Sequence, residues 1–166
     1  MIKALGYFLF YAIISSSCTH KQVNPDDPKS VFQDAKEPYD DGNLELAREK
    51  LGKFKTRFPY SKYVAEAELL IAHSYFQDQQ YLEANIAYRQ FLRLHPKHPK
   101  AAFITFRIGE SLWLESPEEI DRDQRYTKKA IEAWQDLLDQ FPNSSEAKEA
   151  RKKIQTGQKR LAKAYE

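Results

Sequence analysis

A pattern of four residues that recurs along the chain constrains its fold more than any other feature. An alanine is followed by a large apolar residue four positions later, by another three positions after that, and by a proline five positions further on. The three copies are Ala47, Leu51, Phe54 and Pro59; Ala84, Tyr88, Phe91 and Pro96; and Ala130, Trp134, Leu137 and Pro142. Spacings of three and four place side chains on one face of a helix, and a proline ends it. The pattern predicts three helices of one kind.

A partner helix precedes the pattern, most clearly within residues 66–96. Leu69, Ala72, Tyr75 and Phe76 recur at helical spacing before an interruption at residues 77–80. Small residues such as Ala72 let two helices approach closely, and aromatic rings fill the space beside them. This layout is typical of a tetratricopeptide repeat. We therefore expect an all-α, tetratricopeptide-like α-solenoid of about three helix pairs plus a C-terminal helix.

The pattern also predicts the boundaries of the repeat domain and of its parts. The domain is expected at 30–166, with units at 30–59, 64–96 and 100–142 and a terminal helix at 145–165. Ser30 is the expected N-cap of the first helix, and Pro38 should kink or end that helix near Glu37. In the third unit Gly109 takes the place of the small residue, and the charged residues 115–126 form a loop. The terminal helix is either a polar cap or the start of a fourth pair.

The N-terminal segment resembles a bacterial lipoprotein signal. Lys3 precedes an apolar stretch at residues 4–14, which is too short to span a bilayer, and three serines then lead to Cys18, the only cysteine. We expect residues 1–17 to be a signal peptide, Cys18 to be lipidated, and residues 18–29 to form a flexible tether to the membrane. Thr19, which is not an aspartate, favours the outer membrane. The alternative is an ordinary secretory signal with an incidental cysteine.

Composition and motifs exclude several classes of function. The net charge of +2 gives no electrostatic case for binding nucleic acid. The sequence has no glycine-rich phosphate loop and no nucleophile elbow, so we expect neither an enzyme nor a cofactor. His95 and His98 flank Pro96 without an obvious third ligand, so no metal site is expected. An envelope enzyme subunit with an unseen active site is the less favoured alternative.

The first helix of each pair is expected to line the concave side of the solenoid. By repeat position, nine residues should point there: Phe32, Tyr39, Leu69, His73, Phe76, Phe103, Phe106, Glu110 and Trp113. About half of them are expected to be core residues. Tyr63 should lie at the mouth of the groove, where its ring can pack on a partner. An exposed aromatic groove of this kind usually marks a site for a peptide or a protein partner.

Several short motifs add a family resemblance over nearly the whole chain. They are Cys18 after its signal, DGN at 41–43, FPYS at 58–61, RLHPKHP at 93–99, DRDQ at 121–124 and FPNSSEAKEA at 141–150. Together they resemble the BamD family of outer-membrane protein assembly factors. These are lipid-anchored tetratricopeptide proteins on the periplasmic face of the outer membrane, within the β-barrel assembly machinery.

The resemblance implies a non-enzymatic scaffold. Its partners would be the barrel insertase BamA, other assembly lipoproteins and the C-terminal segments of unfolded outer-membrane proteins. It also implies that the groove tyrosine of the family corresponds to Tyr63 and that an aromatic pair corresponds to Tyr75 and Phe76. The family usually has more repeats than are predicted here, and its C-terminal repeats dock on BamA. A periplasmic tetratricopeptide adaptor for cell-wall or envelope-division proteins is the alternative function.

Overall fold

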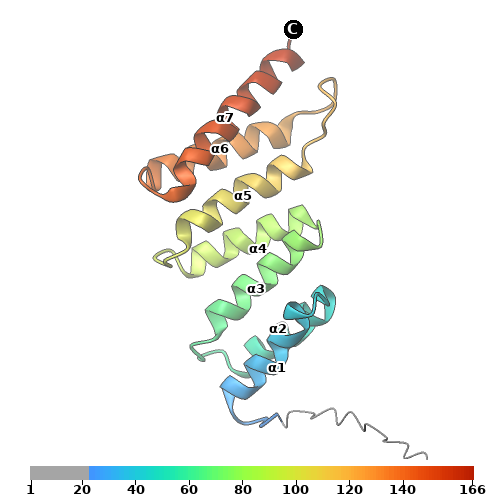
Figure 1. The fold of residues 1–166 in the computed structure, drawn as a ribbon, viewed down its shortest axis with the longest axis vertical. Helices are drawn as coiled ribbons and strands as arrows, with labels where there is room; N and C mark the ends of the chain where they lie inside the picture. The colour runs from blue at the N-terminus through green and yellow to red at the C-terminus, as the bar shows by residue number, and fades with distance from the viewer. Residues whose placement is uncertain (1–22) are drawn as a thin grey trace, which may run out of the picture.

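The structure, a computed structural model, describes residues 23–166. The expected signal peptide and Cys18 therefore lie outside the described residues. Seven helices make up the described part, and Figure 1 shows them stacked one above another along the long axis. They are α1 (Pro28–Asp40), α2 (Leu44–Arg57), α3 (Val64–Gln77), α4 (Tyr81–Leu94), α5 (Ala101–Glu115), α6 (Arg125–Gln140) and α7 (Ser145–Ala164). None of these helices combines the length and the apolar character that crossing a bilayer requires.

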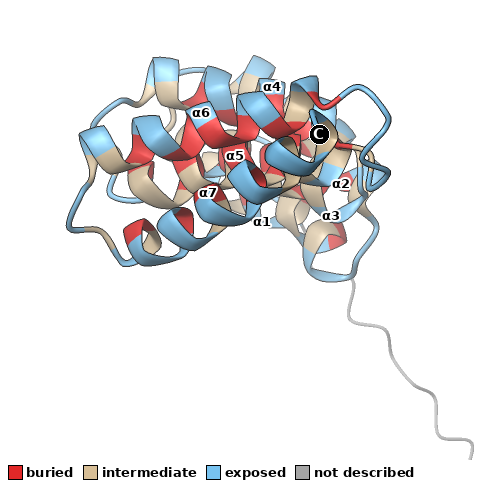
Figure 2. Ribbon diagram, turned by 90° about the horizontal axis from the view of Figure 1, so that it is seen from above, coloured by how far each residue is buried: buried red, intermediate tan, exposed pale blue. Residues whose placement is uncertain are grey.

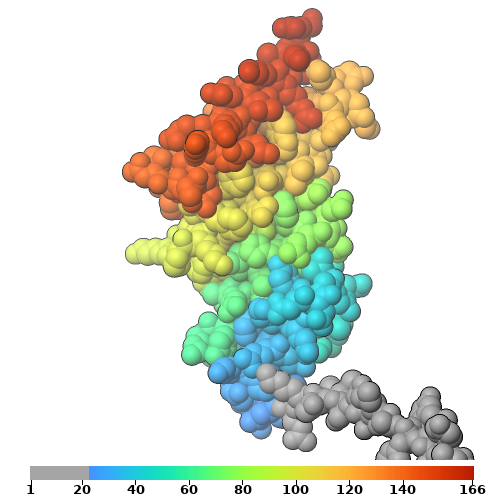
Figure 3. Space-filling view, viewed as in Figure 1, coloured from blue at the N-terminus to red at the C-terminus, as the bar shows by residue number. Residues whose placement is uncertain are grey.

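The helices form a stack of antiparallel neighbours in which each packs on the next in sequence. In the space-filling view the colours follow one another along the molecule as successive bands (Figure 3). Two further contacts join odd-numbered helices, α1 with α3 and α5 with α7, and no comparable contact joins even-numbered helices in the described part. The odd-numbered helices therefore lie on the inner, concave side. The predicted all-α solenoid of helix pairs is confirmed.

The recurring four-residue pattern forms the core of the stack. Its nine apolar members are at most 1% exposed: Ala47, Leu51, Phe54, Ala84, Tyr88, Phe91, Ala130, Trp134 and Leu137. Buried residues lie on the helix faces that meet neighbouring helices, and exposed residues lie on the outer faces (Figure 2). Each patterned helix ends within two residues of its proline. The register predicted from the sequence is confirmed.

Gly109 is the point of closest approach between α5 and α6. A Cβ atom added at this position would lie 2.4 Å from Nε1 of Trp134, well inside van der Waals contact. The same indole N–H donates a hydrogen bond to the carbonyl of Phe106 at 3.2 Å. The indole of Trp134 therefore occupies the volume that any larger residue at position 109 would need, as predicted for the small-residue position.

The first helix begins earlier than the sequence predicts. It begins at Pro28 rather than Ser30, because the Asp27 carboxylate accepts hydrogen bonds from the backbone N–H groups of Lys29 and Ser30 at 3.2 and 3.0 Å. A proline at the first helical position fits this cap, since its missing N–H would have had no partner there. The last two residues of the expected tether, 28 and 29, therefore belong to α1.

Pro38 was expected to kink or end α1 near Glu37, and it does not end the helix there. The helix continues to Asp40, and the Pro38 ring is buried. The last turn is held by backbone hydrogen bonds from Asp41 to Glu37 at 3.0 Å and from Asn43 to Pro38 at 2.7 Å. A proline removes one helical hydrogen bond, and here burial and the bonds of the final turn offset that loss.

The loop between α5 and α6 is anchored by a buried chain of polar side chains. Ser116 donates to the Thr127 hydroxyl at 2.5 Å, because the single proton of Thr127 is donated to the Gln124 side-chain oxygen at 2.8 Å. Gln124 in turn donates to the carbonyl of Glu119 at 2.8 Å. The charged insertion predicted from the sequence is therefore a loop held by side-chain hydrogen bonds. It connects α5, which ends at Glu115, to α6, which begins at Arg125.

The last helix has one packed face and one polar face. Ala147, Ala150, Ile154 and Gly157 are buried against the preceding helices. Gln155 has the same repeat position as Ala72, because each lies the same number of residues after a closing proline, Pro142 or Pro59. Gln155 is exposed, whereas Ala72 is fully buried. At this position α7 therefore presents a polar side chain where α3 buries a small one.

Candidate functional site

The concave side carries a cluster of aromatic rings around one arginine. The guanidinium of Arg107, on α5, lies 4.5 Å from the ring centroid of Phe76 on α3 and 5.1 Å from that of Phe103. Its Nη1 donates to Glu110 at 2.6 Å, whereas its Nε is buried and has no hydrogen-bond partner. Cation–π contact with two rings therefore holds the guanidinium in place while leaving it an unused donor. We call Phe76, Phe103, Arg107 and Glu110 the arginine cluster.

A neutral histidine–tyrosine pair packs against this cluster. Nδ1 of His73 lies 2.7 Å from the Tyr88 hydroxyl, and the His73 ring meets Phe103 edge-on at 5.9 Å. Burial, reinforced by the positive charge of Arg107, lowers the pKa of His73 from 6.5 to about 4. Burial also raises the pKa of Tyr88 above its usual range. Both groups are uncharged at neutral pH, so Arg107 and Glu110 carry the charge at this site.

The cluster extends along the concave side in both directions. Toward α1, the Gln77 side-chain amide donates to the Tyr39 hydroxyl at 2.8 Å, and burial raises the pKa of Tyr39. Toward α7, a pocket of about 280 Å³ opens between α5 and the start of α7. It is lined by Phe103, Phe106, Arg107, Glu110, Glu146 and Glu149. Aromatic and charged groups thus both line the inner face between α1 and α7.

The structure separates the predicted groove residues into three groups. Tyr39, His73, Phe76 and Phe106 lie on the concave side, in or beside the arginine cluster. Phe32 is a core residue at 4% exposure, and Tyr63 stacks on it with ring centroids 5.0 Å apart and planes 10° apart. Tyr63 is therefore half-buried packing between α1 and α3.

Tyr75 and Trp113 also lie away from the arginine cluster. Tyr75 lines a pocket between α2 and α4, on the convex side, with the Arg48 guanidinium 4.7 Å from its ring centroid. Adjacent residues on a helix point in different directions, so Tyr75 and Phe76 do not form one aromatic pair. Trp113 packs near Trp134, at 6.0 Å between centroids, beneath the guanidinium of Arg160 from α7.

Sequence reasoning missed Arg107. An arginine within an apolar helix that carries Phe103 and Phe106 was the available signal, since a cation next to aromatic residues at helical spacing can stack on them. The contact of Arg107 with Phe76 could not be predicted from the sequence, because it joins two different helix pairs.

The two loop histidines have structural partners. His95 lies 2.7 Å from the Glu68 carboxylate, and both His95 and His98 pack against the Phe91 ring. Burial lowers the pKa of His98. Within residues 23–166, no three histidine, cysteine, aspartate or glutamate side chains gather closely enough to hold a metal ion.

Comparisons with known proteins relate the chain to one group of envelope lipoproteins. Residues 24–166 match the YfiO family, described as an outer membrane lipoprotein. An outer membrane protein assembly factor BamD of Neisseria gonorrhoeae is 28% identical over 131 residues, which cover 74% of this chain and 49% of that protein. The BamD of Vibrio cholerae is 24% identical over 170 residues, which cover 96% of this chain and 70% of that protein.

A third relative gives the same result. The BamD of Caulobacter vibrioides is 28% identical over 123 residues, covering 74% of this chain and 40% of that protein. This chain therefore spans about half the length, or less, of the Neisseria and Caulobacter relatives. The family match nevertheless extends over all seven helices of the described part. The chain belongs to the YfiO family of outer membrane lipoproteins.

Proposed function

We propose that this chain is a non-enzymatic scaffold for the assembly and insertion of β-barrel proteins into the outer membrane. Its family membership and the name shared by its relatives, outer membrane protein assembly factor, support this role. The concave groove binds C-terminal segments of unfolded outer-membrane proteins, and the scaffold associates with the barrel insertase BamA and other assembly lipoproteins. No cofactor takes part.

The arginine cluster is the observation that carries the groove assignment. Phe76 and Phe103 offer apolar ring faces, and the Arg107 side chain, which is 31% exposed, places guanidinium N–H groups beside them. A peptide that ends in an aromatic residue supplies both complements, a ring for the apolar faces and a terminal carboxylate for the guanidinium. Hydrogen bonds between a guanidinium and a carboxylate are among the stronger ones in proteins, so the free carboxylate should dominate recognition.

The groove is tested with one peptide in two forms. A ten-residue peptide of alternating apolar and polar residues that ends in phenylalanine is prepared with a free or an amidated C-terminus. Calorimetry should show about ten- to a hundredfold tighter binding of the free form, the equivalent of roughly 1.5–3 kcal/mol for one charged hydrogen bond. Arg107→Gln should abolish that difference, and Arg93→Gln, an exposed arginine on α4, should leave it unchanged. Equal affinity for both forms would contradict the groove proposal.

The membrane anchor is a separate part of the proposal. We propose that Cys18 is acylated and holds the chain on the periplasmic face of the outer membrane, where two or more acyl chains give stable attachment. Replacing Cys18 by alanine should move the protein from the membrane fraction to the soluble periplasmic fraction. Continued sedimentation with outer membranes after this replacement would show that the cysteine is not the anchor.

The partners are tested by affinity purification from detergent-solubilised membranes, with this chain as bait and mass spectrometry as the measurement. Recovery of BamA and its accessory lipoproteins supports the assembly role. Recovery of cell-wall or division proteins in their place would transfer the function to a periplasmic adaptor. Because the chain covers 49% of its Neisseria relative, the purification also measures whether these repeats suffice for the insertase contact.

A further inference from the structure

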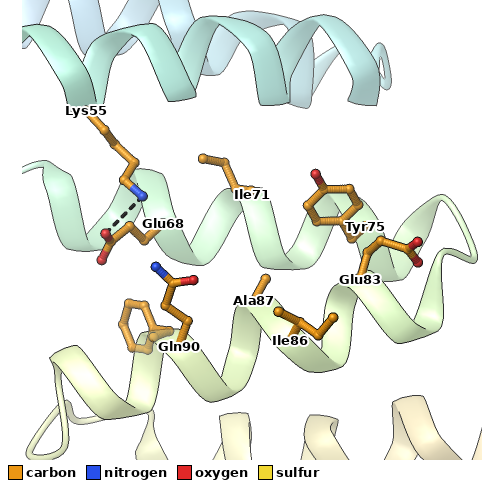
Figure 4. A pocket seen from close by; sticks show the side chains of 9 residues that line it. Lys55, Glu68, Ile71, Tyr75, Glu83, Ile86, Ala87 and Gln90 are labelled. Atoms are coloured by element: carbon orange, nitrogen blue, oxygen red, sulfur yellow. Dashed lines mark ion pairs between the residues drawn. The ribbon is translucent and has the colours of Figure 1, made fainter.

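A second concavity lies on the opposite side of the stack from the arginine cluster. It is a pocket of about 290 Å³ between α2 and α4, with α3 as its floor (Figure 4). Its walls are mainly apolar and come from three helices: Ile71 and Tyr75 of α3, Ile86, Ala87 and Phe91 of α4, and the stem of Lys55 of α2. We call it the convex pocket. Its volume is at the lower limit of small-molecule sites and suits one or two amino-acid side chains.

The curvature of the stack explains why a pocket opens here. The odd-numbered helices contact one another on the inner side, so the even-numbered helices are spread apart on the outer side. The same spreading opens a second groove between α4 and α6. That groove carries charged residues of both signs, Arg89, Lys129, Glu132 and Asp136, beside apolar residues that include Leu82 and Ile86. Of these two grooves, the one between α2 and α4 has the more apolar lining.

Charge at the rim of the convex pocket is unbalanced. Both oxygens of Glu68 are occupied, one by Lys55 at 2.9 Å and the other by His95 at 2.7 Å. Glu83 is exposed at the opposite end of the pocket and makes no ion pair within the described residues. The rim thus offers one free carboxylate next to an apolar floor, and its lysine is already paired.

The apolar surface continues beyond the pocket along α4, toward the groove between α4 and α6, which Ile86 and Leu82 also line. Ile86 is 66% exposed and Leu82 is 37% exposed, one turn apart on the same helix face. A small ligand seated in the pocket would leave this ridge in water, whereas a polypeptide segment would cover both the pocket and the ridge. The ridge favours a protein as the occupant.

We propose that the convex pocket binds a segment of a partner protein in which an aliphatic or aromatic side chain is followed closely by a lysine or arginine. The apolar side chain fills the space above Ile71 and Ala87, and the basic side chain pairs with Glu83. This surface is distinct from the concave groove, so the chain can hold a partner on its outer side while a peptide occupies its inner side.

The test is a selection of random twelve-residue peptides displayed on phage. The bait is the purified Arg107→Gln protein, in which the concave site is disabled, so that failure of one proposal is distinguished from failure of the other. Selected peptides should share an apolar residue followed within a few positions by a lysine or arginine. They should also bind the protein without the Arg107 substitution.

Two variants then locate the binding site of the selected peptides. Ala87→Trp should fill the pocket and reduce affinity at least tenfold. Glu83→Lys, at an exposed position where folding is not at risk, should reduce it about threefold or more at low salt. The matched control is Glu132→Lys, the same charge change in the neighbouring groove, which should change affinity less than twofold. Failure to select any peptide, or selected peptides that bind all variants equally, would overturn the proposal.

Discussion

Gly109 shows how a single residue sets the distance between two helices. A Cβ atom at this position would overlap the Trp134 indole at 2.4 Å, whereas a Cβ at Gly52 would meet nothing within 4 Å. Both glycines lie inside helices. Gly109→Ala should therefore lower the free energy of unfolding by about 1–3 kcal/mol through overpacking. Gly52→Ala should raise it by about 0.5–1 kcal/mol through helix propensity. Urea denaturation of the two variants measures both values, and equal changes would contradict the packing argument.

His73 makes stability depend on pH. Its pKa is about 4 in the folded protein and 6.5 in the unfolded chain, because burial and Arg107 disfavour the charged ring. The unfolded state therefore binds the extra proton between these values, and stability is lost as the pH falls from 6.5 toward 4. Between pH 7 and 5 this group alone should lower the free energy of unfolding by roughly 2 kcal/mol.

The His73 contribution is isolated by comparing the protein with its His73→Gln variant at both pH values. The variant should lose roughly 2 kcal/mol less than the parent protein over this interval, because glutamine does not titrate. Carboxylates and the other histidines titrate equally in both proteins and cancel in the difference. A pH dependence that is identical in the two proteins would mean that His73 is not desolvated.

At the scale of elements, the loop between α5 and α6 depends on its buried hydrogen bonds more than on its length. Thr127 is fully buried and links Ser116 to Gln124. Thr127→Val keeps the shape of the side chain but removes the hydroxyl to which Ser116 and Gln124 are hydrogen-bonded. The free energy of unfolding should therefore fall by about 1–3 kcal/mol. Thr156, which is exposed and bonds only to the Lys152 carbonyl, is the control, and Thr156→Val should have little effect. Thermal denaturation compares the two, and similar melting temperatures would contradict the anchoring role of the network.

At the scale of the whole molecule, α3 joins two hydrophobic cores. One core is centred on α1 and α2 and includes Ala67 of α3, and the other runs from Leu69 and Ala72 through α7. In such a stack each pair is stabilised by its neighbours alone, so damage should remain local. Phe54 is 1% exposed in the first core, and Phe54→Ala should cost about 3–5 kcal/mol there.

Hydrogen exchange followed by mass spectrometry tests this locality. In Phe54→Ala, protection of the amides of α1 and α2 should fall strongly, whereas amides of α5 and α6 should keep most of their protection. The reciprocal variant Leu137→Ala, in the second core, should have the opposite distribution. Uniform loss of protection in either variant would show that the stack unfolds as a single cooperative unit.

Particular residues show what could be predicted from the sequence and what could not. The cap of α1 could be predicted, since Asp27 before Pro28 is a strong start signal, whereas the predicted cap Ser30 lies inside the helix. The placement of Tyr75 and Phe76 on different sides of α3 could be predicted, because adjacent residues of a helix point in different directions, although the family resemblance pairs them. The contact of Arg107 with Phe76 crosses from α5 to α3, so no periodicity within one helix could reveal it.

The sequence by itself determined the helices, their order and their buried faces, because apolar periodicity, small residues and closing prolines act within one or two turns of a helix. Only the tertiary structure decided which side chains of different pairs meet. The inner faces of α3 and α5 bring Arg107 between two rings, and the outward spreading of α2 and α4 opens the convex pocket. Both surfaces arise from the curvature of the stack. That curvature depends on how all the helices pack together, which no local segment of the sequence encodes.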